Sequence, residues 1–185
     1  VSTAPPVLDL TATMARKVLV PLPDTDFDTT EVAVPWRLLS RAGVEVHFAT
    51  EEGRVPACDP LLLTGVLFGQ LGAEPTPVGF YREMEKDARF NAPLRWRDID
   101  PGAYDALVLP GGHAKGMRQY LAGAVLHEKV AALWKRAVPV AAICHGVLVL
   151  ARIISSYAAL ITTFIFRPQV APRGRTRKQT WMMPW

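Results

Sequence analysis

The sequence predicts an α/β fold in which helices cover a mostly parallel sheet. Short apolar runs rich in β-branched residues alternate along the chain with longer segments of helical periodicity, which is the pattern of repeated strand-helix-strand units. The apolar runs end in turns built from proline, glycine or acidic residues. The chain has 185 residues, of which 50% are hydrophobic. This length and composition favour one domain with a sizeable core.

The first strand, the first helix and the second strand are expected between residues 17 and 50. The run "KVLVPL" reads as a buried strand, and a helix is expected from Thr29 to Gly43. Threonine and aspartate side chains can cap its N-terminus, and Gly43 suits the position that closes a helix. Pro35 is tolerated only near the first turn or at a kink, so the helix boundary stays open. The run "VEVHFAT" follows as the second strand.

Residues 51–103 show no clear strand pattern. The segment contains proline, glycine and short helical pieces such as "GFYREMEKDARF". We interpret it as an irregular insertion that lies over the edge of the sheet.

Two further strands, each followed by a helix, complete the predicted layers. The stretch "YDALVLPGGH", residues 104–113, is typical of a buried strand that ends in a glycine turn. The amphipathic helix "AVLHEKVAALWKRA" comes next, and its apolar residues are expected on or near one face: Val125, Val130, Leu133 and Trp134. A strand over residues 138–143 then ends at Cys144, and a helix begins at His145.

The distribution of charge argues against a nucleic-acid partner. Residues 1–150 carry 15 Lys and Arg against 17 Asp and Glu, whereas residues 151–185 carry six cations and no acid. The net charge of +4 therefore belongs to the C-terminal tail, and the body of the fold lacks a basic surface. With only Cys58 and Cys144, no metal-ligand spacing between them and no signal-peptide pattern, reduced thiols in the cytoplasm are expected. Residues 1–13 are interpreted as a flexible extension, and the natural start is either Val1 or, as a hypothesis, Met14.

Three of the predicted strand ends carry polar or reactive groups. The stretches "PDTDFDTTE", "PGGH" and "CHG" follow the first, third and fourth of these strands. Sites in open parallel sheets lie at the carboxyl ends of the strands, so the three stretches are expected to converge. Cys144 would lie at a strand-to-helix turn, where the helix N-terminus favours the reactive thiolate. The alternative is a small apolar thiol in the core, and the turn favours the nucleophile.

The glycines after the third strand suggest an oxyanion site. Gly111 and Gly112 let the backbone turn sharply, so that an amide near Gly112 and the amide of His145 could face an oxyanion. An ordinary glycine turn explains the same residues equally well. His113 is either a polar wall of the pocket or a solvated side chain.

The candidate acids and bases lie near the first helix and beside the cysteine. Glu31 is expected at the start of the first helix, where a carboxylate is stabilised and could act as a general acid or base. Asp24, Asp26 and Asp28 compete with Glu31 for this role on sequence alone. His145 is the candidate base that orients the nucleophile, with a solvent-facing histidine as the alternative.

Three segments together resemble the ThiJ/PfpI superfamily: "LVPLPDTDFDTTEVAVPWRLLSRAGVEVHFAT", "YDALVLPGGHAKGMRQYL" and "PVAAICHGVLVLAR". This superfamily shares the class I glutamine amidotransferase-like fold and includes the parkinsonism-associated deglycase and the glutathione-independent glyoxalase III enzymes. The resemblance places the domain at residues 14–152 and implies a flavodoxin-like three-layer sandwich. It further implies Cys144 as nucleophile, Glu31 hydrogen-bonded to it, and oxyanion amides at Gly112 and His145.

The same resemblance implies a function. We expect a cysteine-dependent enzyme that acts on small reactive carbonyls, such as the conversion of methylglyoxal to lactate, with no metal or organic cofactor. The expected partners are the carbonyl substrate and a second copy of the chain in a homodimer, with no membrane. Glutaminase activity is not expected, because no histidine or acid follows His145. A cysteine hydrolase (peptidase or amidase), a redox-sensing stress chaperone and an inactive relative are the alternatives.

The resemblance ends at Arg152, and residues 153–185 form an atypical basic tail. A frameshift or sequencing error is the preferred interpretation because the composition changes abruptly, and a genuine divergent ending is the second. A membrane anchor is disfavoured because residues 153–166 fall short of the ~20 apolar residues that a transmembrane helix needs. The C-terminal part of the sheet is therefore expected to be incomplete. No acid is left downstream to complete a Cys-His-Asp/Glu triad.

Overall fold

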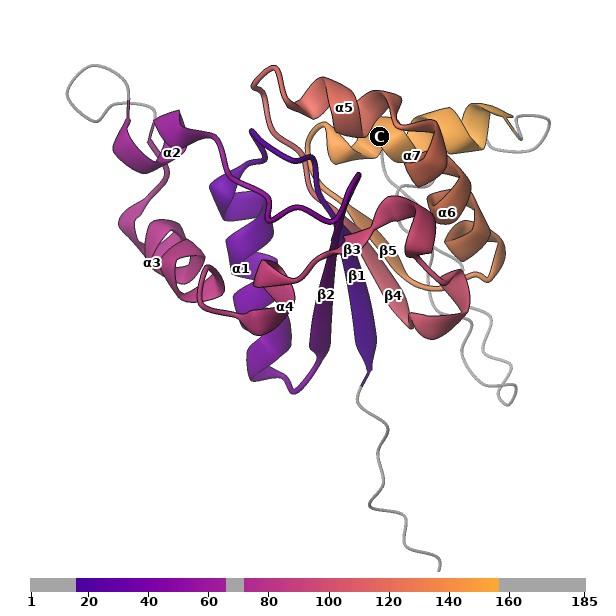
Figure 1. Cartoon of the computed structure of the whole chain (residues 1–185), viewed down its shortest axis with the longest axis horizontal. Helices are drawn as coiled ribbons and strands as arrows, with labels where there is room; N and C mark the ends of the chain where they lie inside the picture. The colour runs from indigo at the N-terminus through magenta and orange to yellow at the C-terminus, as the bar shows by residue number, and fades with distance from the viewer. Residues whose placement is uncertain (1–15, 66–71, 157–185) are drawn as a thin grey trace, which may run out of the picture.

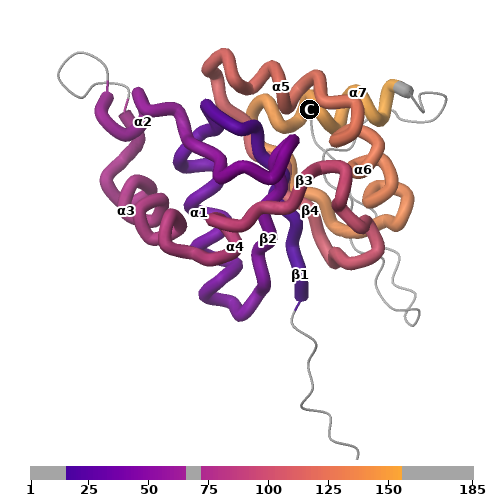
Figure 2. The backbone as a smooth tube through the Cα atoms, in the orientation of Figure 1, coloured from indigo at the N-terminus to yellow at the C-terminus, as the bar shows by residue number. Residues whose placement is uncertain are grey.

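The protein forms a three-layer α/β sandwich, as the sequence predicts. The computed structural model describes residues 16–65 and 72–156. Figure 1 shows the sheet between two groups of helices, with α1 to α4 on one side and α5 to α7 on the other. The backbone trace in Figure 2 shows that the first group comes from the N-terminal half of the chain and the second from the C-terminal half.

Five strands form a sheet that is parallel throughout. Their order is β3-β2-β1-β4-β5, which places β1 in the middle. The strands are β1 (Lys17–Pro21), β2 (Glu45–Thr50), β3 (Leu94–Arg95), β4 (Ala106–Leu109) and β5 (Val140–Ala142). Because β1, β4 and β5 are neighbours, the loops that follow them meet at one edge of the sheet.

Seven α-helices and two short 3-10 helices lie in the described ranges. The helices are α1 (Thr29–Arg41), α2 (Pro60–Thr64), α3 (Pro75–Met84), α4 (Ala88–Asn91), α5 (Met117–Ala122), α6 (Ala124–Lys135) and α7 (Gly146–Ser156). The 3-10 helices are η1 (Trp96–Asp98) and η2 (Pro101–Ala103). None of the helices in the described ranges is long and apolar enough to cross a membrane.

The first helix shows both of the end signals predicted from the sequence. The Asp28 side chain accepts hydrogen bonds from the amides of Thr30 and Glu31, at 2.8 and 3.0 Å. Gly43 follows the helix with a φ of 75°, a left-handed conformation that glycine adopts without penalty. Pro35 lies inside α1, beyond its first turn, and the helix continues to Arg41. The N-terminal cap fixes the position of Glu31 in the first turn.

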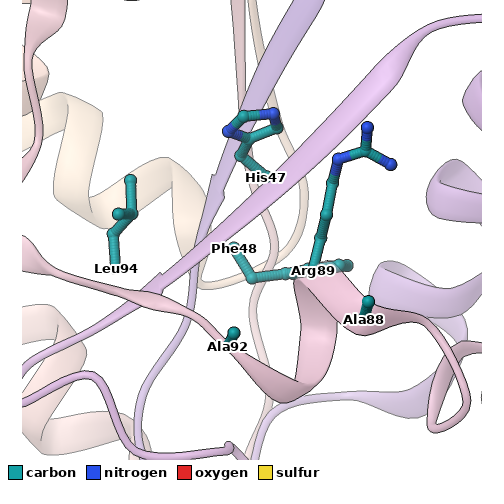
Figure 3. A pocket seen from close by; sticks show the side chains of 6 residues that line it. All are labelled: His47, Phe48, Ala88, Arg89, Ala92 and Leu94. Carbon is teal, nitrogen blue, oxygen red and sulfur yellow. The ribbon is translucent and has the colours of Figure 1, made fainter.

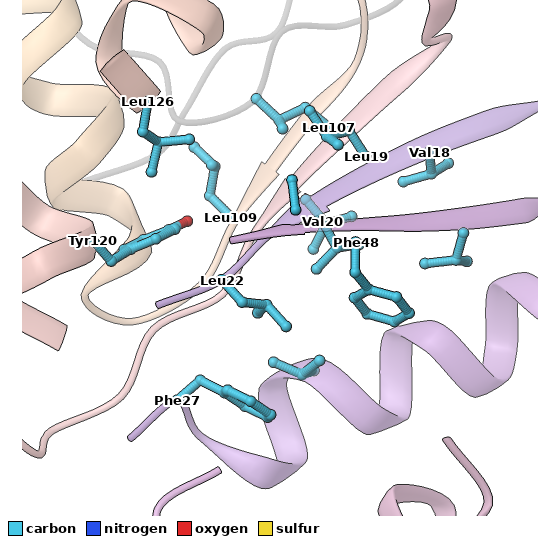
Figure 4. Close-up of a cluster of buried hydrophobic side chains, with 14 of the residues drawn as sticks. Val18, Leu19, Val20, Leu22, Phe27, Phe48, Leu107, Leu109, Tyr120 and Leu126 are labelled. Carbon is cyan, nitrogen blue, oxygen red and sulfur yellow. The ribbon is translucent and has the colours of Figure 1, made fainter. Parts of the chain in front are cut away.

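The core fills both faces of the central strands. Leu19 in β1 and Leu107 in β4 are paired in register and almost fully buried, and Figure 4 shows them side by side. On α6 the buried residues are Leu126, Val130 and Leu133, which recur at helical spacing. The expectation for Val125 is wrong, because its side chain is 44% exposed: it lies one residue before this buried stripe.

The segment 51–103 contributes to the sheet, which the sequence did not predict. Its strand β3 pairs with the end of β2, joining Ala49 to Leu94 and Thr50 to Arg95. It is the outermost strand on the β2 side of the sheet. The indole Nε1 of Trp96 donates a hydrogen bond of 3.2 Å to the carbonyl of Ala49 and holds this edge in place. Helix α3 packs against α1 and extends the same helical layer.

The predictions for the chain ends fall mainly outside the described residues. This is the case for the extension at residues 1–13, for Met14 and for residues 157–185. Helix α7 runs through Ser156, so the sequence boundary at Arg152 falls inside a helix.

Candidate active site

The loops after β1, β4 and β5 converge, as the sequence predicts. The amide of Gly111, after β4, donates a hydrogen bond of 2.7 Å to Oε2 of Glu31 in α1. The carbonyl of Gly111 accepts one of 2.9 Å from the amide of Asp28. A Cβ placed on Gly111 would lie 2.7 Å from the amide nitrogen of His145, after β5. The loop after β4 is therefore packed between the start of α1 and the start of α7, and glycine at position 111 makes this approach possible.

Cys144 occupies the sharp turn between β5 and α7. Its φ is 49°, which is uncommon for a residue other than glycine. The turn is fixed on both sides, because the amide of Ile143 bonds to Leu109 and the amide of Gly146 bonds to the carbonyl of Ile143. The Cys144 side chain is exposed at this edge of the sheet.

Three side chains surround the sulfur of Cys144. Nδ1 of His145 lies 3.5 Å from Sγ, and Nε2 of His113 lies 3.9 Å from it. The two imidazole rings are nearly perpendicular, with centroids 5.0 Å apart. The carboxyl group of Glu31 is close enough to the thiol for each group to shift the pKa of the other. The structure thus brings together the sequence candidates Glu31, His113, Cys144 and His145.

Of the four acids near the first helix, Glu31 is the one that reaches the sulfur. Asp28 caps α1, and Oδ2 of Asp26 accepts the amide of Gly116 at 2.7 Å. Asp24 forms an ion pair with Arg54, with 2.6 Å between the nearest oxygen and nitrogen. The three aspartates therefore cap the helix or hold the loops around it, which leaves Glu31 as the acid beside Cys144.

Burial raises the pKa of the Glu31 carboxyl above its ordinary value of 4.5. The hydrogen bond from Gly111 opposes this shift, and the nearby charge of Asp28 adds to it. A carboxyl group with a raised pKa is better suited to give and take protons near neutral pH than an exposed one.

The pKa of the Cys144 thiol is also raised, mainly by desolvation. The amide of His145 lowers this pKa, whereas the charge of Glu31 raises it further. The net shift is upward, so desolvation and the neighbouring carboxylate outweigh the stabilisation of the thiolate by the amide of His145 at the helix N-terminus. Desolvation of the partly buried sulfur is the main cause of the raised pKa, and the charge of the Glu31 carboxylate adds to it. Glu31 and His145 are the two groups beside the thiol that can accept a proton.

The candidate oxyanion donors differ in whether their amides are free to bind an oxyanion. The amide of Gly111 already donates to Glu31, whereas the amide of His145 lies beside the sulfur of Cys144. Gly112 has a φ of 157°, and a Cβ there would lie 2.7 Å from the carbonyl of Asp26, so the turn requires glycine. His113 follows directly and is exposed at the mouth of the site.

Tyr120 is a neighbour of the site that the sequence analysis did not select. Its side chain is fully buried, and its hydroxyl has no hydrogen-bond partner among the described residues. Burial and the charge of Glu31 both raise its pKa well above the ordinary value, which places the phenol near this carboxylate. Nothing in the sequence pattern pointed to it, because α5 itself was not predicted.

Two cavities lie away from the cysteine. One of about 320 Å³ is formed by β2, α4 and β3 and is shown in Figure 3; it is lined by His47, Phe48, Ala88, Arg89, Ala92 and Leu94. The other, of about 410 Å³, is lined by Arg16, Val18, Leu39, Val44, Asp105, Ala106 and Pro139. Neither of these two cavities is lined by Cys144 or Glu31.

Comparison with protein families gives one match over most of the chain. A family model described as ThiJ/PfpI family-like matches residues 22–165. The match includes Glu31, the loop after β4 and Cys144, and it continues past Arg152, where the resemblance seen in the sequence ended.

Two curated proteins and one solved structure are among the relatives. An uncharacterized protein of Schizosaccharomyces pombe is 34% identical over 98 residues, covering 52% of this chain and 37% of the relative. A deglycase of Thermococcus kodakarensis is 42% identical over 60 residues, covering 30% of this chain and 32% of the relative. Glyoxalase III of Candida albicans has a similar fold, with a TM-score of 0.51 and 23% identity over 72% of this chain and 59% of that one. The matches span about a third of the length of the two curated relatives.

Proposed function

Because the chain belongs to the ThiJ/PfpI-like family, we propose that it is a cysteine-dependent enzyme acting on small reactive carbonyl compounds, with methylglyoxal as the reference substrate. The names of two relatives, a deglycase and a glyoxalase III, support this class of substrate. The expected homodimer and the cytoplasmic location remain part of this proposal.

The observation that carries the proposal is the environment of Cys144. A thiol at a left-handed turn is exposed, and a carboxyl group and two imidazoles surround its sulfur. A nucleophile with proton-accepting groups within reach is the arrangement that covalent catalysis requires.

In the first step the sulfur of Cys144 attacks the aldehyde carbon of methylglyoxal. The thiol proton passes to Glu31 or His145, and the product is a hemithioacetal. Negative charge develops on the aldehyde oxygen during the attack. The amides near Gly112 and at His145 are the donors proposed to stabilise it.

In the second step a base removes the proton from the carbon that now carries sulfur. Glu31 is the proposed base, because burial raises its pKa toward the range useful for proton transfer. The resulting enediol takes a proton at the neighbouring carbon, which leaves a lactoyl thioester on Cys144. Water then hydrolyses the thioester and releases lactate and the free thiol. The sum is methylglyoxal plus water giving lactate, so neither oxidant nor reductant is needed.

Lactate formation from methylglyoxal without glutathione tests the proposal. We expect the purified full chain to form lactate and Cys144→Ala to form no more than a reaction without enzyme. Cys58→Ala is the matched control, because Cys58 is buried in the core and should be dispensable for chemistry. Full turnover by Cys144→Ala would show that the proposal is wrong.

A redox sensor is the second candidate, because the thiol of Cys144 is exposed and can be oxidised. Folded protein with no turnover, and with a mass increase of one or two oxygens on Cys144 after mild peroxide treatment, would favour the sensor. Release of amines from peptides or amides by the same thiol would favour a hydrolase.

A further inference from the structure

Three side chains at the turn after β5 offer ligands of the kind that zinc prefers. Sγ of Cys144, Nε2 of His113 and Nδ1 of His145 all lie within 4.8 Å of one another. They come from two loops, one after β4 and one after β5, so the sequence spacing did not suggest a metal site. One sulfur and two imidazole nitrogens form a common donor set for Zn²⁺.

The distances match those of a tetrahedral zinc site. Zinc lies about 2.3 Å from a thiolate sulfur and about 2.0–2.1 Å from an imidazole nitrogen, so tetrahedral ligands place sulfur and nitrogen about 3.6 Å apart. In the protein these distances are 3.5 Å to His145 and 3.9 Å to His113. Both sulfur–nitrogen distances are therefore compatible with a single ion bound between the three residues.

The surroundings also suit a cation. His113 and Cys144 are exposed and His145 is half-buried, so an ion can reach the ligands from solvent. Glu31 lies beside the sulfur and adds negative charge. Three protein ligands leave the fourth position of a tetrahedral ion open for water or a small anion.

We propose that Cys144, His113 and His145 bind one zinc-like divalent cation, and that the bound ion blocks the Cys144 sulfur. Binding replaces the thiol proton by the metal, and the proton is released to solvent. The sulfur lone pair is then used by the metal and cannot attack a carbonyl carbon. The ion takes no part in the proposed reaction. The binding does not depend on the proposed function; only a loss of turnover on binding would rest on it.

The other histidines and the other cysteine provide matched controls. Cys58 is buried in the core, and Nε2 of His47 lies 3.3 Å from a carboxylate oxygen of Glu45. His127 lies in α6, where burial lowers its pKa. None of these residues belongs to the cluster of metal-ligand atoms found in the described ranges.

Cobalt titration of the purified full chain tests the site without measuring activity. We expect Co²⁺ to give a thiolate-to-cobalt charge-transfer band in the near ultraviolet that saturates at one ion per chain and disappears when Zn²⁺ is added. Cys144→Ala should abolish the band, and His113→Ala should weaken cobalt binding about tenfold or more. Cys58→Ala and His47→Ala should leave the band unchanged. No band, or a band that persists in Cys144→Ala, would overturn the proposal.

Alkylation measures the blocking separately. We expect one equivalent of Zn²⁺ to slow the reaction of Cys144 with iodoacetamide and a chelator to restore the rate. Alkylation at an unchanged rate, with the ion bound, would show that the sulfur is not blocked. If cobalt binds but the chain forms no lactate, the metal site stands and the proposed function is wrong. If lactate forms and no cobalt binds, the proposed function stands and the proposed metal site is wrong.

Discussion

At the scale of single residues, opposing contacts set the pKa of Glu31. Its carboxylate accepts the amide of Gly111, while burial and the charge of Asp28 disfavour the ionised form. The net effect is a raised pKa, so the folded protein holds a proton on this residue to a higher pH than the unfolded chain does. Ionised Glu31 therefore destabilises the fold.

The sign of this effect can be tested with Glu31→Gln. Stability due to Glu31 falls as pH rises from about 4.5 through the folded pKa, because the folded state binds more protons in that range. Glutamine keeps an acceptor for Gly111 and removes the charge. We expect the variant to melt at a higher temperature than the wild type at neutral pH, and the two to converge below the ordinary carboxyl pKa.

Thermal melts from about pH 4 to pH 8 measure this difference. The same variant should lose about 10²–10⁴-fold in lactate formation if Glu31 transfers the proton. A variant less stable than the wild type at neutral pH would contradict the reasoning about burial.

The sequence selected candidate residues that the structure brings together, but it did not show all of the contacts between them. Cys144 and Gly112 were selected because each follows a strand in a fold whose strand ends form the site, and Glu31 was selected because the resemblance to the ThiJ/PfpI superfamily implies it. Asp24, Asp26 and Asp28 could not be told from Glu31, since the choice depends on side-chain direction in one turn. Tyr120 and the pairing of His113 with Cys144 were missed for a related reason: both depend on contacts between distant segments, which no local pattern records.

At the scale of elements, the close approach of α7 to β4 holds the turn at Cys144 in place. A Cβ on Gly146 would lie 2.7 Å from the carbonyl oxygen of Pro110 and would also collide with the carbonyl of Leu109. These neighbours are backbone atoms at the end of β4, so they cannot move without moving the strand. Glycine at the first residue of α7 therefore allows the helix to begin directly above the sheet.

Gly146→Ala is expected to lower the free energy of unfolding by about 1–3 kcal/mol or more, because it forces backbone atoms apart. Gly79→Ala is the matched control: Gly79 lies in α3 with no atom within 4 Å of an added Cβ, and alanine should stabilise this helix by about 0.5–1 kcal/mol. Urea unfolding followed by tryptophan fluorescence measures both. Equal changes in the free energy of unfolding for the two variants would mean that α7 leaves room for a Cβ at position 146 against the end of β4.

The clarity of the apolar pattern, more than element length alone, explains which parts of the fold were predictable: β5 has three residues and was still predicted from the apolar run that contains it. Strands β1, β2, β4 and β5 and helices α1, α6 and α7 lie where the sequence placed them, because each has a clear apolar pattern. Strand β3 has two residues and helix α5 has six. Elements this short carry no periodicity, and tertiary contacts such as that of Trp96 with Ala49 decide their structure.

At the scale of the whole molecule, the two cysteines differ in how deeply the fold buries their thiols. Cys144 is exposed at the edge of the sheet. Cys58 is 4% exposed and belongs to the core, beside Phe27 and Tyr81. Burial raises the pKa of the Cys58 thiol, which makes it less reactive still. The first thiol is accessible in the folded protein, whereas the second becomes accessible only when the core opens.

We therefore expect one thiol per chain to react quickly with Ellman's reagent in the folded protein and two after unfolding in urea. The slow thiol should become reactive along the same urea curve as the loss of tryptophan fluorescence, because both follow the opening of the core. Cys144→Ala should remove the fast phase alone. Two fast thiols in the folded protein would show that the core around Cys58 is not closed.

The left-handed turn at Cys144 has a consequence for how this chain evolves. Glycine adopts a φ of 49° freely, whereas another residue in this region loses about 1–2 kcal/mol. Selection for stability alone would therefore favour glycine at position 144, and selection for the sulfur opposes it. Under the function proposed above, this position is a trade-off between stability and activity. A descendant that no longer needed the thiol would be free to lose it, and its fold would be the more stable for the loss.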